Sequence, residues 1–422
     1  RIAFDVNRKV RAQSLALDFV FDAGNHPLVV ELSYGYVLAV YKDKCPGFWD
    51  ENLEWHDGFF DPQEWQIEDL IRLSYLLNLF SIPIYALLLY FVGIDNRKKN
   101  RILCGLAGLQ LLLTAALRAT TVGGDLENYV PLYSRLGKED WSEVFTGRIE
   151  PGYMFLNKIL TLFSTDERLL LVVIGGIVVA GFCAFIYKNS RILWLSLFLF
   201  VALGIYTTSL SMLRQSIAIV FTLMSIRYVE RRSFWKFSML VGTAVLFHYT
   251  AITFFILYPL ARFKPTWGYF LCMLGGGFVC AWLLGKMLLV SLIERYYSIY
   301  EGTMAGGTGD NMLLLLIAVT AFGLLTEGRQ KYDRRRNILT HMMILACCFQ
   351  CMALHFGLMA RIVLYFSVSQ LVFLPNAISY MGMKDLKFLA VSSVFVLSFS
   401  YFVVFVLGND SCGILPYRFM WE

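Results

Sequence analysis

Long apolar runs separated by short polar segments fill the chain from residue 74 onward, and this pattern predicts a bundle of membrane-spanning helices. About twelve spans are predicted, two of them too short to cross a hydrocarbon core of about 30 Å upright at about 1.5 Å per residue. We expect the FHYTA break between these two short helices to lie within the membrane and to face a wet cavity. The predicted spans are residues 74–94, 102–118, 169–187, 192–210, 215–229, 237–248, 250–261, 267–285, 312–326, 338–356, 362–380 and 388–407.

Basic residues gather in alternate connections between these spans, which predicts an orientation. The basic connections contain the sequences DNRKKNR, KNSR, ERRSFWK, RFK, GRQKYDRRR and KDLK. By the positive-inside rule these connections are cytoplasmic, so the others and the C-terminal tail lie on the outer face. An even number of spans then places the N-terminus outside as well. The predicted outer connections are residues 119–168, 207–214, 248–250, 286–311 and 356–361.

Composition supports a membrane protein and separates two domains. The 422 residues are 58% hydrophobic and only 16% charged, which excludes a soluble domain. Residues 1–72 hold 7 Lys and Arg against 13 Asp and Glu, whereas residues 73–422 hold 30 against 18. These opposite balances predict an N-terminal domain, residues 1–72, and a multi-span membrane domain, residues 73–422.

The nine cysteines give neither a disulfide framework nor a metal motif. Most lie inside apolar runs, and the cluster of Cys347, Cys348 and Cys351 has no pairing His or Cys at ligand spacing. We expect these side chains to fill the helix bundle. The sequence predicts no metal, no cofactor and no nucleic-acid partner.

Residues 1–72 have the pattern of a small α/β fragment. The runs ALDFVFD and HPLVVELSYGY, separated by AGN, predict a β-hairpin. The order Asp18 then Glu31 resembles the C-terminal tail of an ATP-grasp domain, in which an acid on one strand and a Glu-x-Asn on the next hold magnesium and phosphates. Ser33 replaces that Asn, and the glycine-rich lid and the nucleotide lysines are absent. An N-terminus outside the cell cannot meet ATP, so we expect a non-functional fusion.

The first long outer connection carries most of the candidate chemistry. Asp125, Glu127 and Glu150 are candidate general bases, because a carboxylate at a membrane rim can take a proton from a sugar hydroxyl. The alternative interpretation is that these acids belong to a solvated loop and have no catalytic role. Tyr129 and Tyr153 can stack on sugar rings or anchor the segment in lipid. The sequence EPGY begins an amphipathic run, YMFLNKILTLF, that we expect at the interface.

Three arginines, Arg118, Arg214 and Arg361, lie at predicted helix ends on the outer rim. An arginine near hydrocarbon costs about 2.5–3.5 kcal/mol on insertion scales, so it usually has a partner or a function. Its planar fork suits a phosphate or a carboxylate. Gln215 follows Arg214, and His248 marks the break between the two short helices at the same depth. The alternatives are arginines that snorkel to the interface and a histidine that serves only packing or hydrogen bonding.

Residues 74–422 resemble the EpsG-type, Wzy-like polysaccharide polymerases of bacteria. The resemblance rests on the order and spacing of the motifs LRATTVGGDLENY, EPGYMFLNKIL, LRQSIAIVFTLMSIRYVERRSFWKF, VLFHYTAI, ARIVLYF and LPYRFMW. It implies an all-α polytopic membrane fold of about twelve transmembrane helices, similar to the GT-C fold of large membrane glycosyltransferases. It also implies that a growing glycan on undecaprenyl pyrophosphate is transferred to the non-reducing end of another lipid-linked repeat unit.

The same resemblance implies roles, partners and a location. The implied partners are glycans linked to undecaprenyl pyrophosphate, membrane lipids, a flippase and a chain-length regulator, and the implied product is exopolysaccharide, capsule or O-antigen. The active face would lie on the outer side of the bacterial inner membrane. The implied catalytic acids are Asp125, Glu127 and Glu150, and the implied substrate-binding residues are Arg118, Tyr129, Tyr153, Arg214, Gln215, His248 and Arg361.

Two other functions fit parts of the pattern. A transporter or flippase of lipid-linked oligosaccharide would show helix patterns repeated in two halves and polar residues near mid-membrane. This chain instead gathers its polar residues at the outer rim. A membrane acyltransferase would need a reactive histidine, for which His248 is the only candidate.

Overall fold

The computed structural model of the chain divides into two compact units, Arg1–Leu73 and Ser74–Glu422. Helices make up nearly all of the second unit, and strands occur in the first. The structure describes residues 16–21, 27–33, 47–49, 55–57, 62–142, 149–287, 309–327, 333–408, 412–415 and 417–420.

The first unit contains two antiparallel strand pairs within its described residues. Strand β1 (Ala16–Phe21) pairs with β2 (Pro27–Ser33), which confirms the predicted hairpin. Asp18 lies opposite Glu31 in this register, and the register shifts directly after Asp18. The second pair is β3 (Gly47–Trp49) with β4 (Trp55–Asp57).

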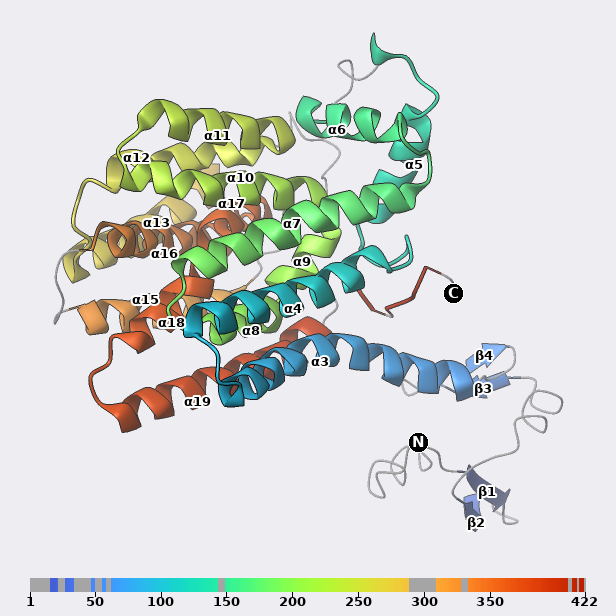
Figure 1. The fold of residues 1–422 in the computed structure, drawn as a ribbon. Helices are drawn as coiled ribbons and strands as arrows, with labels where there is room; N and C mark the ends of the chain where they lie inside the picture. Colours follow the sequence, from blue (N-terminus) through green and yellow to red (C-terminus); the bar gives the residue numbers. More distant parts are fainter. Residues whose placement is uncertain are drawn as a thin grey trace. The chain divides into compact units, whose positions relative to one another are not determined.

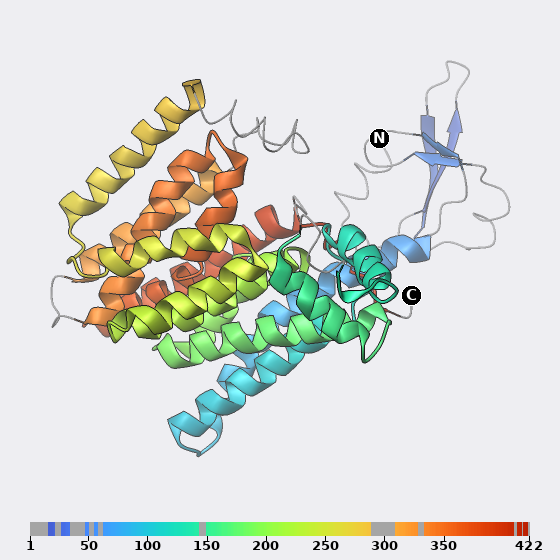
Figure 2. The ribbon, with the colours of Figure 1, turned by 90° about the horizontal axis from the view of Figure 1, so that it is seen from above.

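The second unit is a helix bundle, and every predicted apolar span falls on one of its helices or on two consecutive ones (Figure 1). Helices α4, α7 and α10 lie side by side in both views, and α10 also packs on α11 and α16 (Figure 2). The helices are α3 (Pro62–Phe91, which begins in the first unit), α4 (Asn96–Ala116), α5 (Leu126–Leu136), α6 (Pro151–Thr161), α7 (Glu167–Asn189), α8 (Leu193–Ala202), α9 (Ile205–Ser211), α10 (Leu213–Glu230), α11 (Phe234–Phe247), the 3₁₀ helix η2 (Tyr249–Ile256), α12 (Leu257–Leu260), α13 (Trp267–Met287), α15 (Asp310–Glu327), α16 (Arg334–Ala353), α17 (Gly357–Ser367), α18 (Gln370–Ser379), α19 (Lys384–Tyr401) and the π-helix η4 (Phe402–Leu407).

Three aspartates fix where helices begin. The carboxylates of Asp95, Asp166 and Asp333 accept hydrogen bonds from the backbone N–H two residues later, at 2.9, 3.0 and 3.0 Å. Each bond satisfies one amide that has no partner inside its helix, and such a cap stabilises a helix by about 1 kcal/mol. These caps start α4, α7 and α16, and α16 is buried along nearly its whole length at the centre of the bundle.

The predicted span 192–210 is broken rather than continuous. Gly204 has a φ of 71°, a left-handed conformation that separates α8 from α9, and the two helices differ in direction by 50°. By length and apolarity, three helical segments of the described chain can cross a membrane, and this bent pair makes a possible fourth. The three are α7, residues 359–379 and residues 384–407, and five shorter apolar helices accompany them.

Apolar side chains cover parts of the bundle surface. Within residues 384–407 only 11% of the apolar window is buried, and Phe388 and Leu397 are 75% and 69% exposed. Apolar surface on this scale is what lipid-facing helices present. The second unit is therefore an all-α membrane protein.

The segment predicted as an outer loop, residues 119–168, contains two short helices. Helix α6 coincides with the predicted amphipathic run, and α5 precedes it. Both lie at one end of the bundle, the same end as the C-terminal segment (Figure 1). Asp125 and Glu150, which directly precede α5 and α6, are therefore held at helix starts rather than on an irregular loop.

Candidate functional site

The first turn of α6 packs tightly against the end of α11. A Cβ placed on Gly152 would lie 2.8 Å from the carbonyl oxygen of Leu246, so only glycine allows this approach. Glu150 is the residue immediately before α6, and His248 is the extended residue between α11 and η2. The close contact at Gly152 brings these two side chains together.

A buried ionic network centres on Glu150. Its Oε1 lies 2.9 Å from His248 Nδ1, and its Oε2 forms a salt bridge with Arg214 Nη1. Arg214 Nε donates a hydrogen bond to Tyr129 Oη at 3.0 Å. The side chain of Glu150 is only 4% exposed. One network therefore joins α5, α6, α10 and the break after α11.

The pKa of Glu150 shows which role this carboxylate suits. Burial alone would raise that pKa, but the hydrogen bond with His248 and the positive charge of Arg214 outweigh burial and lower it to about 2. Glu150 is therefore ionised near neutral pH and holds a proton poorly. A catalytic base works best with a pKa near the working pH, so Glu150 suits the positioning of Arg214 and His248 better than proton transfer.

The pKa of Asp125 is shifted in the opposite direction from that of Glu150. It is half-buried at the start of α5, where its backbone N–H donates to Ser211 Oγ at 3.2 Å and its side chain does not cap the helix. Burial raises the pKa of Asp125, and the positive charges of Arg361 and Arg214 offset this only in part. Of the acids at this end, Asp125 is therefore the better suited to accept a proton.

The C-terminal segment holds the turn that precedes Asp125. Gly123 has a φ of 121°, which only glycine adopts readily, and its N–H donates to Gly413 O at 2.7 Å. The N–H of Gly124 donates to Cys412 O at 2.8 Å. Segments separated by nearly three hundred residues thus fix the position of the candidate base, and sequence reasoning did not foresee this.

The three predicted rim arginines have different surroundings. Arg118 is only 2% exposed, and its Nη1 donates to Leu210 O at 2.6 Å. It therefore joins the end of α4 to α9 and takes no part in the network around Glu150. The charges of Arg214 and Arg361 both act on Asp125. Gln215 Nε2 donates to the backbone oxygen of Arg361 at 2.5 Å, which ties α10 to α17 at the site.

The remaining predicted residues differ in accessibility. Tyr153 is fully buried, with its ring centre 5.3 Å from that of Tyr129, so it packs inside the site instead of facing outward. Glu127 is exposed and makes no hydrogen bond or ion pair within the described residues. The structure brings together Asp125, Tyr129, Glu150, Tyr153, Arg214, Gln215, His248 and Arg361.

The sequence model of the EpsG family matches residues 101–419, a stretch that contains every residue of this site. The chain belongs to the EpsG family. Membership confirms the resemblance seen in the sequence and associates the chain with polysaccharide polymerases of exopolysaccharide biosynthesis. Neither the comparison with curated proteins nor that with solved structures gave a significant match.

Two structural features of this EpsG-family site lie outside the sequence predictions. Lys158 is buried in α6, and its Nζ donates to Leu136 O at 2.8 Å, which joins α6 to the end of α5. Ser211 supports Asp125, as noted above. The sequence could have indicated the role of Lys158, because a lysine in the middle of an apolar run is unusual. It could not have indicated the role of Ser211, because a serine is ordinary in such a segment.

Proposed function

We propose that this EpsG-family chain is a membrane glycosyltransferase that polymerises oligosaccharide repeat units linked to undecaprenyl pyrophosphate. The product would be an exopolysaccharide, a capsule or an O-antigen. The observation that carries the proposal is the juxtaposition of Asp125, whose pKa is raised, with the cations Arg214 and Arg361 at one end of the bundle. A transfer from a pyrophosphate donor needs both a base and a clamp for the leaving group.

In the proposed reaction a hydroxyl at the non-reducing end of one lipid-linked repeat attacks the anomeric carbon of the growing glycan. The new glycosidic bond forms as the bond from that carbon to the pyrophosphate breaks. Asp125 takes the hydroxyl proton, and undecaprenyl pyrophosphate leaves with the bonding electrons. Arg214 and Arg361 stabilise the charge that develops on the pyrophosphate. Arg214 Nη2 has no hydrogen-bond partner among the described residues and is available for this contact.

His248 is the competing candidate for the base. Ionised Glu150 can only accept a hydrogen bond, so the proton of a neutral His248 ring lies on Nδ1. Its Nε2 is then an acceptor, and this atom is buried without a partner in the described part of the chain. The same arrangement orients a general-base histidine in other enzymes. Variants of Asp125 and His248 separate the two assignments.

We further propose a GT-C-like fold that crosses the bacterial inner membrane about twelve times, with the site and both termini on the outer side. By length and apolarity the described chain has three spanning segments, or four with the bent pair, and the proposal counts the five shorter apolar helices and α4, α10 and α16, of 21, 18 and 20 residues, as further spans. Glu230 and the basic residues near it lie at the opposite end of α10 from Arg214, roughly 24 Å away at about 1.5 Å per residue. A reporter active only in the cytoplasm, fused after Glu422, should be silent, and a bright reporter would overturn this orientation.

The test of the function is the size of surface glycan in a strain that lacks this protein. Resupplying the chain should restore long polymer, while its absence should leave single repeat units on the lipid at the outer face. Repeat units trapped on the cytoplasmic side would instead indicate a flippase. A flippase and a chain-length regulator are the proposed partners, and purification of the tagged chain from its own membranes tests for them.

We also propose that residues 1–72 are dispensable for polymerisation. The division into two units at residue 73 supports this, but α3 runs unbroken from Pro62 to Phe91. The test therefore compares two truncated chains, one that begins at Leu73 and a control that begins at Pro62 and keeps this helix whole. Loss of polymer from the chain that begins at Leu73, at normal membrane abundance, would contradict the proposal.

A further inference from the structure

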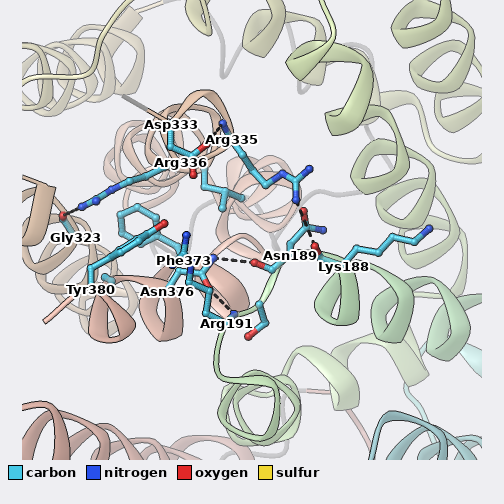
Figure 3. A pocket seen from close by; sticks show the side chains of 13 residues that line it. Lys188, Asn189, Arg191, Gly323, Asp333, Arg335, Arg336, Phe373, Asn376 and Tyr380 are labelled. Carbon is cyan, nitrogen blue, oxygen red and sulfur yellow. Dashed lines mark hydrogen bonds between the residues drawn. The ribbon is translucent and has the colours of Figure 1, made fainter. Parts of the chain in front are cut away.

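A second polar site lies at the other end of the bundle, where α16 begins and α7 and α18 end. It is a cavity of about 230 Å³ (Figure 3), and none of the residues that line it belongs to the site around Asp125. Among the charged residues that line it, four are basic and one is acidic. They are Lys188, Arg191, Arg335, Arg336 and Asp333.

Arg336 is a buried cation with unused hydrogen-bonding capacity. It is only 9% exposed, and its Nη2 donates to Gly323 O at 3.2 Å and to Thr326 Oγ1 at 3.3 Å. Its Nη1 is buried and has no partner among the described residues. Figure 3 shows Arg336 extending across the cavity wall to Gly323. A charged donor that is buried without an acceptor is costly, so the positive charge of this guanidinium beside the cavity is only partly compensated.

The wall of the cavity brings a second cation close to the first. The guanidinium carbons of Arg191 and Arg336 lie 4.4 and 4.7 Å from the ring centre of Tyr380, so they are no more than about 9 Å apart. The ring attracts each cation, but the two like charges repel each other across a partly dry space. An anion in the cavity near both guanidinium groups would offset this repulsion.

The two nearby carboxylates interact with Arg335. Asp333 accepts a hydrogen bond from the backbone N–H of Arg335 as the cap of α16. Glu230 pairs with the side chain of Arg335 at 2.9 Å. Within the described residues, neither carboxylate forms an ion pair with Arg191 or Arg336.

Close packing fixes the shape of this site. A Cβ on Gly323 would lie 2.1 Å from Cζ of Phe373, so glycine at this position lets α15 approach α18. On the opposite wall, Asn376 Oδ1 accepts from the N–H of Arg191 at 2.7 Å, and its Nδ2 donates to Asn189 O at 2.8 Å (Figure 3). The backbone beside the two arginines is thus positioned before any ligand enters.

We propose that this cavity binds a phosphoryl group, supplied by the headgroup of an anionic phospholipid at the membrane boundary or by free phosphate. A phosphoryl group offers several acceptor oxygens to converging guanidinium forks, which a chloride ion does not. The start of α16 adds the positive end of a helix dipole. The proposal is independent of the polymerase reaction, because the cavity shares no residue with the site around Glu150.

The experiment measures the melting temperature of the purified full chain in two settings. In detergent, inorganic phosphate is titrated against chloride at matched ionic strength. In nanodiscs, phosphatidylcholine alone is compared with phosphatidylcholine containing phosphatidate. Stabilisation by phosphatidate identifies a lipid headgroup, and stabilisation by phosphate alone identifies the free ion.

Arg191→Gln is the test variant, because Arg191 is exposed and its loss should not prevent folding. It should raise the phosphate concentration for half-maximal stabilisation by about tenfold or more, since a charge-assisted hydrogen bond is lost. Arg97→Gln is the matched control, an exposed arginine outside the cavity, and it should behave like the unchanged chain. No stabilisation in either setting, or an equal loss in both variants, would overturn the proposal.

Discussion

Glu150 Oε1 lies 2.9 Å from His248 Nδ1, although 98 residues separate the two along the chain. The contact joins the start of α6 to the break after α11. Because the other oxygen of Glu150 binds Arg214, one carboxylate sets the positions of both neighbours. A change at Glu150 is therefore expected to affect stability and activity together, unlike a change at an exposed acid.

The pH dependence of stability should identify Glu150. Its folded pKa of about 2 lies below the ordinary 4.5, so its ionised form stabilises the fold above pH 4.5, and this contribution is lost as the pH falls toward about 2. The difference corresponds to roughly 3 kcal/mol at about 1.36 kcal/mol per pH unit.

Melting of the unchanged chain and of Glu150→Gln should therefore be compared from pH 7 down to pH 2. The variant should melt at a lower temperature at pH 7, and the gap should close in the acid range. A gap that is independent of pH would mean that the charge of Glu150 contributes nothing to stability. Glu127→Gln, at an exposed position, should match the unchanged chain throughout.

Asp125→Asn should abolish long polymer while single repeat units accumulate on the lipid. The amide keeps the size of the side chain but cannot take a proton, and loss of a general base typically lowers a rate by about 10²–10⁴-fold. Because the pKa of Asp125 is raised, Asp125 becomes protonated at a higher pH than an ordinary aspartate does. As the pH is lowered, the polymerisation rate of the unchanged chain should therefore start to fall at that higher pH. Polymer length on gels and the rate in membrane vesicles measure both effects.

The outcome of that experiment also decides between two bases. Full-length polymer from Asp125→Asn together with loss of polymer in His248→Gln would assign the base to His248. Full polymer from both variants would remove acid–base chemistry from this end of the bundle. Glu127→Gln again serves as the control, since Glu127 is exposed and makes no hydrogen bond or ion pair within the described residues.

Arg214→Lys should lower the polymerisation rate by about 10- to 100-fold without changing membrane abundance. Lysine keeps the charge but cannot bind Tyr129 and Glu150 at once while facing a pyrophosphate, and a charge-assisted hydrogen bond contributes about 1.5–3 kcal/mol. Arg227→Lys is the matched control, because Arg227 is exposed on the same helix at its other end. An unchanged rate in Arg214→Lys would mean that Arg214 only holds Glu150.

The apolar pattern predicted the helices well because a helix that faces lipid or core needs a long apolar sequence whatever its neighbours are. The same pattern missed α5, since eleven residues of mixed polarity resemble a loop. It also missed the break at Gly204, because both flanking helices are apolar and a window over them shows one continuous run.

The site was predictable in its residue types but not in its pairings. The sequence pointed to Glu150, Arg214 and His248 separately, since a charged or polar side chain stands out beside hydrocarbon. It could not show that Glu150 binds both of the others, or that the C-terminal segment supports Asp125. Such contacts depend on how distant helices pack, and no local spacing records them.

Gly152→Ala tests whether the packing of α6 on α11 creates the site. Alanine normally stabilises a helix by up to about 1 kcal/mol relative to glycine, but here the new methyl group would lie 2.8 Å from a backbone oxygen of α11. The backbone of α11 cannot shift without disturbing the helix, and overpacking of this kind lowers the free energy of unfolding by about 1–3 kcal/mol. We therefore expect a lower melting temperature and, because the shift separates Glu150 from His248, a large loss of polymer.

The control for this change lies in the partner helix itself. Gly242 is within α11, and a methyl group added there would meet no atom within 4 Å. Gly242→Ala should therefore melt at the same or a slightly higher temperature and should make normal polymer. If Gly152→Ala also makes normal polymer at normal abundance, the close approach of the two helices is not what holds Glu150 against His248. If both variants melt at a lower temperature and lose polymer, an added methyl group disturbs this pair of helices wherever it is placed, and the contact at Gly152 is not the specific cause.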